Sequence, residues 1–127
     1  MDIETLKAHA LAKPAATHDF PFDTETMALR VKGKIFVLVP TAARPQQANF
    51  KCDPNWAEIL RQTYAAVTPG YHMNKRHWNT VIFDGTISDD EILEMVDHAY
   101  DQVVKGLPKK DREALQKTEH CSSLEAV

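Results

Sequence analysis

Residues 71 to 79, YHMNKRHWN, form the densest group of side chains in this sequence that could do chemistry. Its cations could hold phosphates, and its amides could hydrogen-bond phosphates or base edges. These polar residues are Asn74, Lys75, Arg76 and Asn79. Tyr71 and Trp78 could stack on an exposed base. The segment therefore predicts contact with nucleic acid, with the alternative that its aromatic residues belong to the core, where tryptophan is usually found.

Two histidines in the same segment, His72 and His77, could suggest a metal site or a catalytic centre. Their separation matches neither one side of a strand nor a standard helical pair, and no nearby cysteine or carboxylate completes a zinc set. No serine, cysteine or acid stands beside either histidine to make a nucleophile and its base. Phosphate loops of the GxGxxG or Walker type are absent from the sequence. We therefore expect no enzymatic activity, cofactor or metal, and we assign both histidines to the nucleic-acid-binding segment.

The elements that must position this segment begin with an amino-terminal helix. Apolar residues recur at helical spacing from Ile3 to Leu11, and the helix is expected to end at Lys13, because the residue before a proline avoids the α region. Residues 17 to 25 predict a loop, in which Phe20 and Phe22 close the edge of the core.

Strands are predicted in the middle of the chain. Residues 27 to 39, MALRVKGKIFVLV, contain two β-rich runs separated by Lys32 and Gly33, which predicts a hairpin with a tight turn. Further strands are predicted at residues 48 to 52 and 77 to 83, with a turn at residues 68 to 70.

Two more helices carry clear start signals. Asp53 and Pro54 suit the cap and the first position of a helix. Its predicted apolar face comprises Trp56, Ile59, Leu60 and Tyr64. Ser88 and Glu91 have the spacing of a capping box ahead of a long amphipathic helix that Gly106 should end. Clustered strands joined by short turns predict an α+β fold, an antiparallel sheet with helices packed on one face.

The length of 127 residues suits one domain, and the composition is that of an ordinary globular protein. The amino terminus carries acids where a signal peptide would carry cations, and no window approaches the unbroken apolar stretch of a membrane helix. We expect a soluble cytoplasmic protein without membrane association. Cys52 and Cys121 are expected to remain free thiols, as is usual in that compartment.

The net charge of −3 hides a division along the chain. Residues 26 to 83 carry eight cations and two acids, net +6, whereas residues 84 to 127 carry five cations and eleven acids, net −6. Lys32 and Lys34 at the hairpin tip could join Lys51 and the later cations in a patch that attracts phosphates. The alternative is that these cations decorate turns and strand edges, where lysine discourages edge pairing.

The last long helix offers a second kind of site. Asp90, Glu94, Asp97 and Asp101 share one helical face, with His98 beside them. This carboxylate stripe could bind a protein partner, a small ligand or a divalent cation. The alternative is the solvated side of an amphipathic helix.

The motifs NFKCDP, PGYHMNKRHWNTV and LPKK, together with HDFPF at 18 to 22, resemble those of the MmcQ/YjbR family of small bacterial proteins. The resemblance covers residues 3 to 112 and implies a CyaY-like fold. It implies one domain at residues 1 to 112, with residues 113 to 127 as an extension beyond it. From its own residues, we expect this extension either to continue as a helix or to be mobile. It also implies a non-enzymatic, double-wing DNA-binding protein in which Lys51, Lys75 and Arg76 lie near the binding surface.

The leading hypothesis is thus a DNA-binding domain of unknown oligomeric state that uses its basic middle segment. The predicted nucleic-acid-binding residues are Lys32, Lys34, Lys51, Tyr71, His72, Asn74, Lys75, Arg76, His77, Trp78 and Asn79.

Overall fold

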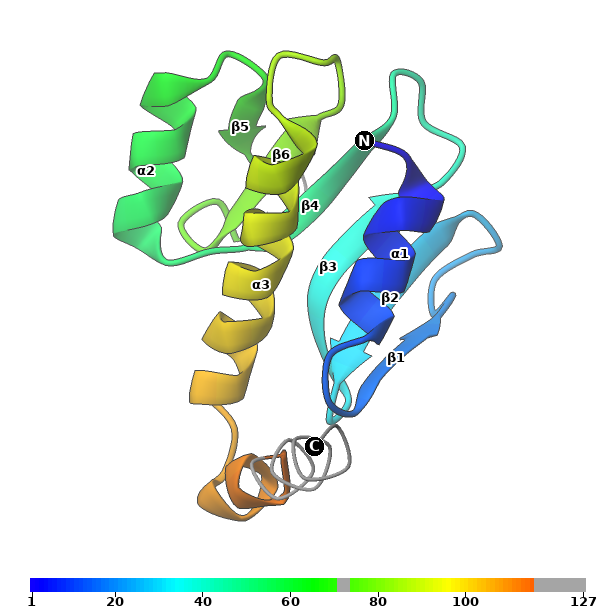
Figure 1. Ribbon diagram of the computed structural model, residues 1–127, viewed down its shortest axis with the longest axis vertical. Coiled ribbons are helices and arrows are strands. Elements are labelled where there is room, and N and C mark those ends of the chain that lie inside the picture. Colours follow the sequence, from blue (N-terminus) through cyan, green and yellow to red (C-terminus); the bar gives the residue numbers. More distant parts are fainter. Residues whose placement is uncertain (71–73, 116–127) are drawn as a thin grey trace, which may run out of the picture.

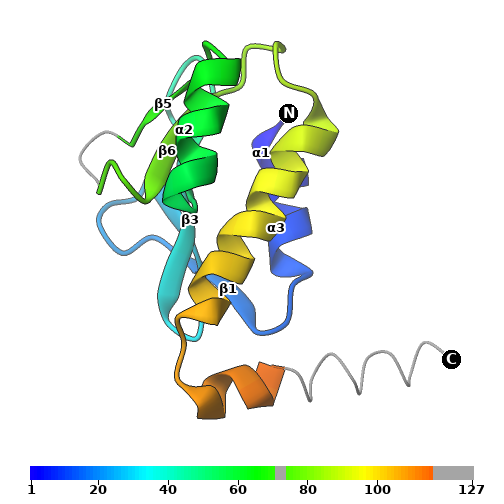
Figure 2. The same cartoon turned by 90° about the vertical axis from the view of Figure 1, so that its left-hand side faces the viewer.

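A computed structural model describes residues 1–70 and 74–115 of the chain. Its elements are α1 (Ile3–Leu11), β1 (Ala16–Asp19), β2 (Thr26–Val31), β3 (Lys34–Pro40), β4 (Gln47–Lys51), α2 (Pro54–Thr63), β5 (Val67–Pro69), β6 (Trp78–Ile82) and α3 (Asp89–Lys105). The strands form one antiparallel sheet in the order β1-β2-β3-β4-β6-β5. The helices pack on one face of this sheet (Figures 1 and 2), so the predicted α+β class is confirmed.

The hairpin predicted around Lys32 and Gly33 is confirmed. Both residues have positive φ angles, 51° and 80°, which is the backbone conformation of the tight turns that suit twisted antiparallel strands. The Arg30 guanidinium donates to the Gly33 carbonyl oxygen and to Asp19 Oδ1, each at 2.9 Å. The turn therefore holds Lys32 and Lys34 at the end of a braced hairpin.

The predicted helix starts are confirmed as well. Asp53 Oδ2 accepts from the backbone N–H groups of Asn55 and Trp56, and Pro54 opens α2. Ser88 Oγ accepts from the Glu91 N–H at the start of α3. The Glu91 carboxylate does not complete the capping box but accepts a hydrogen bond from the hydroxyl of Tyr64, the residue that follows α2.

Two edge strands replace predicted irregular segments. Residues 16 to 19, placed mostly in a loop, form β1 and pair with β2, while Phe20 and Phe22 are 45% and 67% exposed instead of closing the core. The predicted turn at residues 68 to 70 is largely β5, which pairs with β6. Both predictions were wrong because an edge strand needs neither apolar alternation nor a free N–H at every residue, so polar residues and Pro69 are tolerated there.

The core lies between the sheet and its helices. Leu6 of α1, Phe36 of β3 and Val96 of α3 are fully buried, and the Phe36 and Tyr100 rings meet edge to face with centroids 5.5 Å apart. Beyond α3, residues 109 to 115 are helical and Leu115 is buried. Within residues 1–70 and 74–115, no helix has the length and apolar character needed to cross a membrane.

Candidate functional site

A hollow of about 350 Å³ lies where the end of the sheet meets the end of α3. Lys34 opens β3 and Lys51 closes β4, and because these neighbouring strands are antiparallel, both lysines reach the same end of the sheet. The remaining lining residues are Ile35, Gln102, Val103, Gly106, Leu107 and Pro108. Of the described residues around the hollow, none is acidic, so it combines apolar walls with two lysines.

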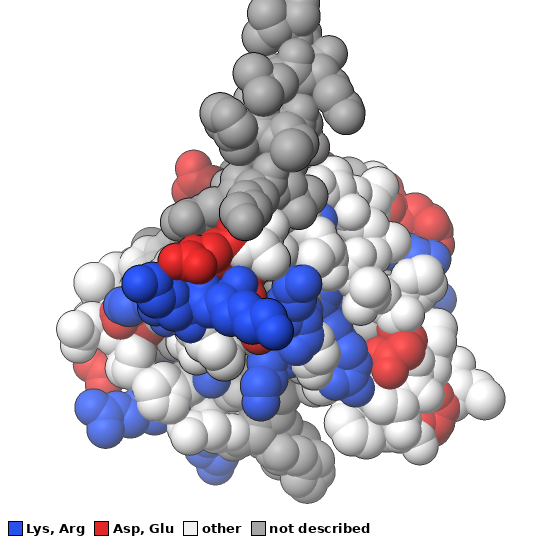
Figure 3. All heavy atoms as spheres, turned by 90° about the horizontal axis from the view of Figure 1, so that it is seen from below, with Lys and Arg blue, Asp and Glu red and all other residues white. Residues whose placement is uncertain are grey.

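Further exposed cations flank the hollow. Lys32 lies two residues before Lys34, in the hairpin turn. Lys105, Lys109 and Lys110 lie next in sequence to the lining residues Gly106 to Pro108, at and beyond the end of α3. Figure 3 shows Lys and Arg side chains gathered on this side of the molecule. The sequence hypothesis missed the last three lysines because their segment is acidic overall. The LPKK motif at residues 107 to 110 was the available signal.

Lys75 and Arg76 extend this surface. Both are exposed in the turn before β6, whose first residue, Trp78, pairs with Lys51 at the same end of the sheet. The Asn74 side-chain oxygen accepts from the Arg76 N–H at 3.0 Å and shapes the turn. We name the resulting surface the basic end, comprising Lys32, Lys34, Lys51, Lys75, Arg76, Lys105, Lys109 and Lys110. Within the described part of the chain, its one ion pair joins Lys109 to Glu113 at 3.9 Å.

Trp78 and Asn79 do not belong to this surface. Trp78 is 9% exposed, and its ring lies beneath Lys51, with Nζ 5.6 Å from the ring centroid. Asn79 is 1% exposed and bonds within the protein, where it accepts from Arg61 and donates to the Ala57 carbonyl oxygen. The predicted stacking and phosphate-contacting roles of these two residues are therefore corrected to structural ones, because burial leaves neither side chain free for a ligand.

The remaining predicted nucleic-acid contacts differ in their exposure. Asn74 is exposed, whereas His77 is half-buried and its carbonyl oxygen accepts from the Cys52 N–H at 2.8 Å. Tyr71 and His72 lie outside the described residues.

Two cations of the basic middle segment lie outside the basic end and donate to other groups of the protein. Arg61 of α2 donates to Asn79 Oδ1 at 2.7 Å, to the Trp78 carbonyl oxygen at 3.2 Å and to the Lys75 carbonyl oxygen. It therefore ties α2 to the turn that carries Lys75. Arg44 lies in the β3–β4 connection, at the other end of the sheet, and donates to the carbonyl oxygens of Thr41 and Ala43.

Gly70 permits the close approach on which that turn depends. Its N–H donates to the Trp78 carbonyl oxygen at 2.9 Å. A Cβ atom at this position would lie 2.8 Å from Trp78 Cβ, closer than such atoms come in proteins. Glycine at the head of the motif therefore reflects packing against Trp78.

The acidic stripe of α3 is partly used for packing. Asp97 Oδ1 accepts from Lys13 Nζ at 2.6 Å and lies 2.7 Å from His9 Nε2, so it joins α1 to α3. Burial opposes ionisation of this carboxyl, but the hydrogen bonds from Lys13 and His9 outweigh it and lower the pKa of Asp97. No group of three His, Cys, Asp or Glu side chains within residues 1–70 and 74–115 could hold a metal ion.

Cys52 and His98 lie where α3 meets the start of α2. Burial, reinforced by the Asp53 charge, raises the pKa of the Cys52 thiol to about 12 and keeps it protonated. His98 Nε2 accepts from the Asp53 N–H at 3.0 Å, and its ring packs edge-on against Trp56. Burial lowers the pKa of His98, against the opposing effect of the Asp53 and Asp101 carboxylates.

The lowered pKa of His98 predicts a pH-dependent stability. In the unfolded chain histidine titrates near pH 6.5, so the stability supplied by neutral His98 is complete above that pH and declines as the pH falls through it. Protonation also removes the acceptor of the Asp53 N–H. The wild-type protein should therefore lose unfolding free energy as the pH falls from about 7.5 to about 5.5. In the His98→Gln variant we expect this loss to be smaller by up to about 1 kcal/mol, the contribution of roughly one hydrogen bond.

Urea unfolding at the two pH values measures this difference. The control is His18→Gln, which changes an exposed histidine outside this contact. A His98→Gln variant with an unchanged pH profile would contradict the prediction.

Comparison with known proteins shows relatives along most of the chain. The sequence profile of the YjbR family matches residues 11–102. The uncharacterized protein YjbR of Escherichia coli K12 is 35% identical over 115 residues, covering 91% of this chain and 98% of that protein. The uncharacterized protein YbdF of Escherichia coli O157:H7 is 34% identical over 113 residues, covering 89% of this chain and 93% of that protein.

A solved structure agrees with the architecture described above. The crystal structure of a Deinococcus radiodurans protein with a DUF419 domain superposes with a TM-score of 0.84 at 33% identity, covering 90% of this chain and 87% of that one. Sequence and fold agree over nearly the whole length, and the chain belongs to the YjbR family.

Proposed function

We propose that the protein binds DNA through the basic end and acts as a binding domain without catalytic activity. The observation that carries this proposal is the convergence of Lys34 and Lys51 on one hollow, with exposed lysines from the end of α3 around it. Phosphates are the ligands that such a group of largely unpaired cations favours. Under this proposal the protein acts in the cytoplasm.

The arrangement suggests which elements would meet the DNA backbone. The β2–β3 hairpin carries Lys32 and Lys34 at its tip, and the β5–β6 connection carries Lys75 and Arg76. In this proposal the two connections serve as the wings of a double-wing arrangement, and the hollow lies where the hairpin meets the end of α3. Because phosphate contacts carry little sequence information, we expect weak sequence preference.

A salt titration tests the proposal. We expect fluorescence anisotropy of labelled single- and double-stranded DNA to report binding at about 50 mM salt. With about five phosphates contacted, the log of the affinity should fall with the log of salt at a slope of roughly −4 to −5 on duplex DNA. Absence of binding to either DNA at low salt would contradict the proposal. Equal competition by heparin and by DNA would show a general polyanion site.

A further inference from the structure

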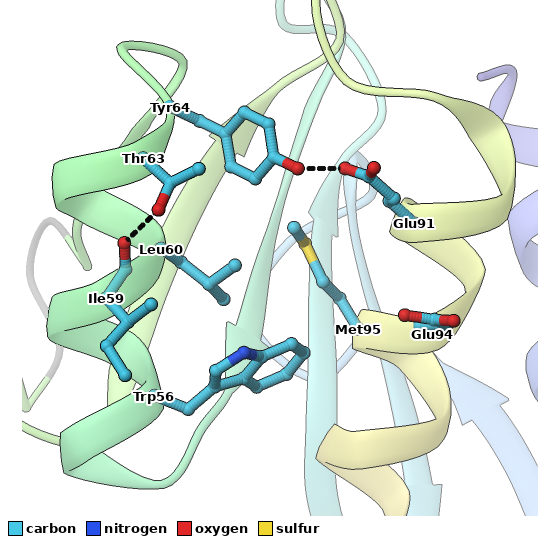
Figure 4. Close-up of a pocket in the computed structure, with 8 residues that line it drawn as sticks. All are labelled: Trp56, Ile59, Leu60, Thr63, Tyr64, Glu91, Glu94 and Met95. Atoms are coloured by element: carbon cyan, nitrogen blue, oxygen red, sulfur yellow. Dashed lines mark hydrogen bonds between the residues drawn. The ribbon is translucent and has the colours of Figure 1, made fainter.

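A second concave site lies between α2 and the first half of α3, away from the basic end. Figure 4 shows this groove, of about 290 Å³, with side chains of both helices pointing toward one another across it. Its lining residues are Trp56, Ile59, Leu60, Thr63, Tyr64, Glu91, Glu94 and Met95. Met95 stands seven residues before Gln102 of the basic hollow, about 10 Å along the helix at 1.5 Å per residue.

The groove has an apolar floor and an exposed apolar wall. Leu60 and Met95 are buried at its base, and the Trp56 ring closes one end (Figure 4). Ile59, which the sequence assigned to the apolar face of this helix, is 56% exposed. Its side chain lines the groove and is open to solvent.

The polar atoms of the groove favour a cation. The Tyr64 hydroxyl donates to the Glu91 carboxylate across the opening, and this hydrogen bond, reinforced by burial, raises the pKa of Tyr64 and keeps it a donor. Glu94 is exposed and forms no hydrogen bond or ion pair with any residue in the described ranges. None of the eight lining residues is basic, so no cation of the groove neutralises the two carboxylates at its apolar, aromatic rim.

We propose that this groove binds a small organic ammonium ion, with an aromatic or branched apolar body between Trp56 and Met95 and its ammonium group at Glu94 and Glu91. The volume lies at the lower end of the range for small-molecule sites, about 300 Å³, which suits a ligand the size of an indole with a short side chain. Aromatic faces and carboxylates both attract cations, while an anionic ligand would be repelled. The proposal does not rest on DNA binding at the basic end.

Three indole probes that differ in charge test the proposal by NMR amide-shift titration of the full chain. We expect tryptamine, an ammonium, to shift the amides of groove residues. Its neutral hydroxyl analogue tryptophol should bind about 10-fold more weakly, which is the range expected for one charge-assisted hydrogen bond. Indole-3-acetate, an anion, should not bind. Equal binding of the three probes, or no shift with tryptamine up to about 10 mM, a weak millimolar-range affinity, would overturn the proposal.

Matched variants test whether the Glu94 carboxylate binds the ammonium group. Glu94→Gln should weaken tryptamine binding about 10-fold, while Asp90→Asn, an equal change on the same helix outside the groove, should leave it unchanged. Ile59→Arg should block the groove by placing a cation beside it. Unchanged binding in Glu94→Gln would refute the assignment. Binding of a leucine- and lysine-rich helical peptide without any response to tryptamine would also refute it and assign the groove to a protein partner.

Discussion

Reversing the charge of Lys34 and Lys51 together is expected to weaken DNA binding by about 100-fold or more at about 100 mM salt. The two lysines line the same hollow from adjacent strand ends, so the double substitution Lys34→Glu with Lys51→Glu places two anions at the centre of the basic end. Loss of two phosphate contacts should also reduce the steepness of the log–log salt dependence by about two. Fluorescence anisotropy across a salt series measures both effects.

A control variant separates the site from net charge. Lys7→Glu with Arg44→Glu makes the same change in charge on α1 and at the other end of the sheet, and it should weaken binding less than about 5-fold through the general field alone. Circular dichroism of both variants checks that the fold is kept. Equal losses in the two variants would show that net charge, and not the basic end, governs binding.

The second contact region is tested in the same assay. Lys75→Glu with Arg76→Glu alters the β5–β6 connection, where both side chains are exposed. We expect this double variant to bind DNA more weakly than the wild-type protein. Because both side chains are exposed, its stability should not change. Unchanged affinity would restrict the interface to the hairpin and the end of α3.

Arg61→Met is expected to destabilise the protein by about 3 kcal/mol. The guanidinium donates to Asn79, to Trp78 and to the turn at Lys75, and its removal leaves the oxygen of the buried Asn79 side chain without its charged donor. Losing a hydrogen bond from a charged group and stranding a buried acceptor each cost about 1 to 3 kcal/mol. The midpoint of urea unfolding measures the change.

Neighbouring substitutions sharpen that result. Gln62→Met alters an exposed residue of the same helix and should change the unfolding free energy by less than about 0.5 kcal/mol. Arg61→Lys keeps the charge without the planar fork of donors and should recover only part of the stability. If Arg61→Met unfolds with wild-type stability, the role assigned to this bond network is wrong.

The elements that local sequence specifies were predictable. The Lys32–Gly33 turn, the Asp53 and Ser88 caps and the end of α3 at Gly106 all follow from backbone conformations or hydrogen bonds that a few neighbouring residues decide. The edge strands β1 and β5 were not predictable in the same way. Their pairing depends on β2 and β6, which lie elsewhere in the chain, and their own residues show no strand periodicity.

For the candidate site, too, some residues were predictable from the sequence and others were not. Exposed Lys75 and Arg76 agree with what their residue types suggested, whereas Trp78 and Asn79, two and three positions after Arg76, are buried. Where β6 begins, side chains leave the turn and enter the sheet, and composition alone does not mark that boundary. Composition likewise does not show the structural role of Arg61, because its partners become neighbours only after α2 packs on β6.

By itself the sequence determined the family, the α+β class, most of the helix and strand starts and the basic character of the middle segment, because these depend on residue order and local conformation. Tertiary structure alone decided which cations share a surface. It brought Lys34, Lys51 and the lysines at the end of α3 around one hollow, turned Arg61 inward and left Arg44 at the far end. The physical reason is that antiparallel pairing places strand ends side by side at distances in space that are unrelated to their separation along the chain.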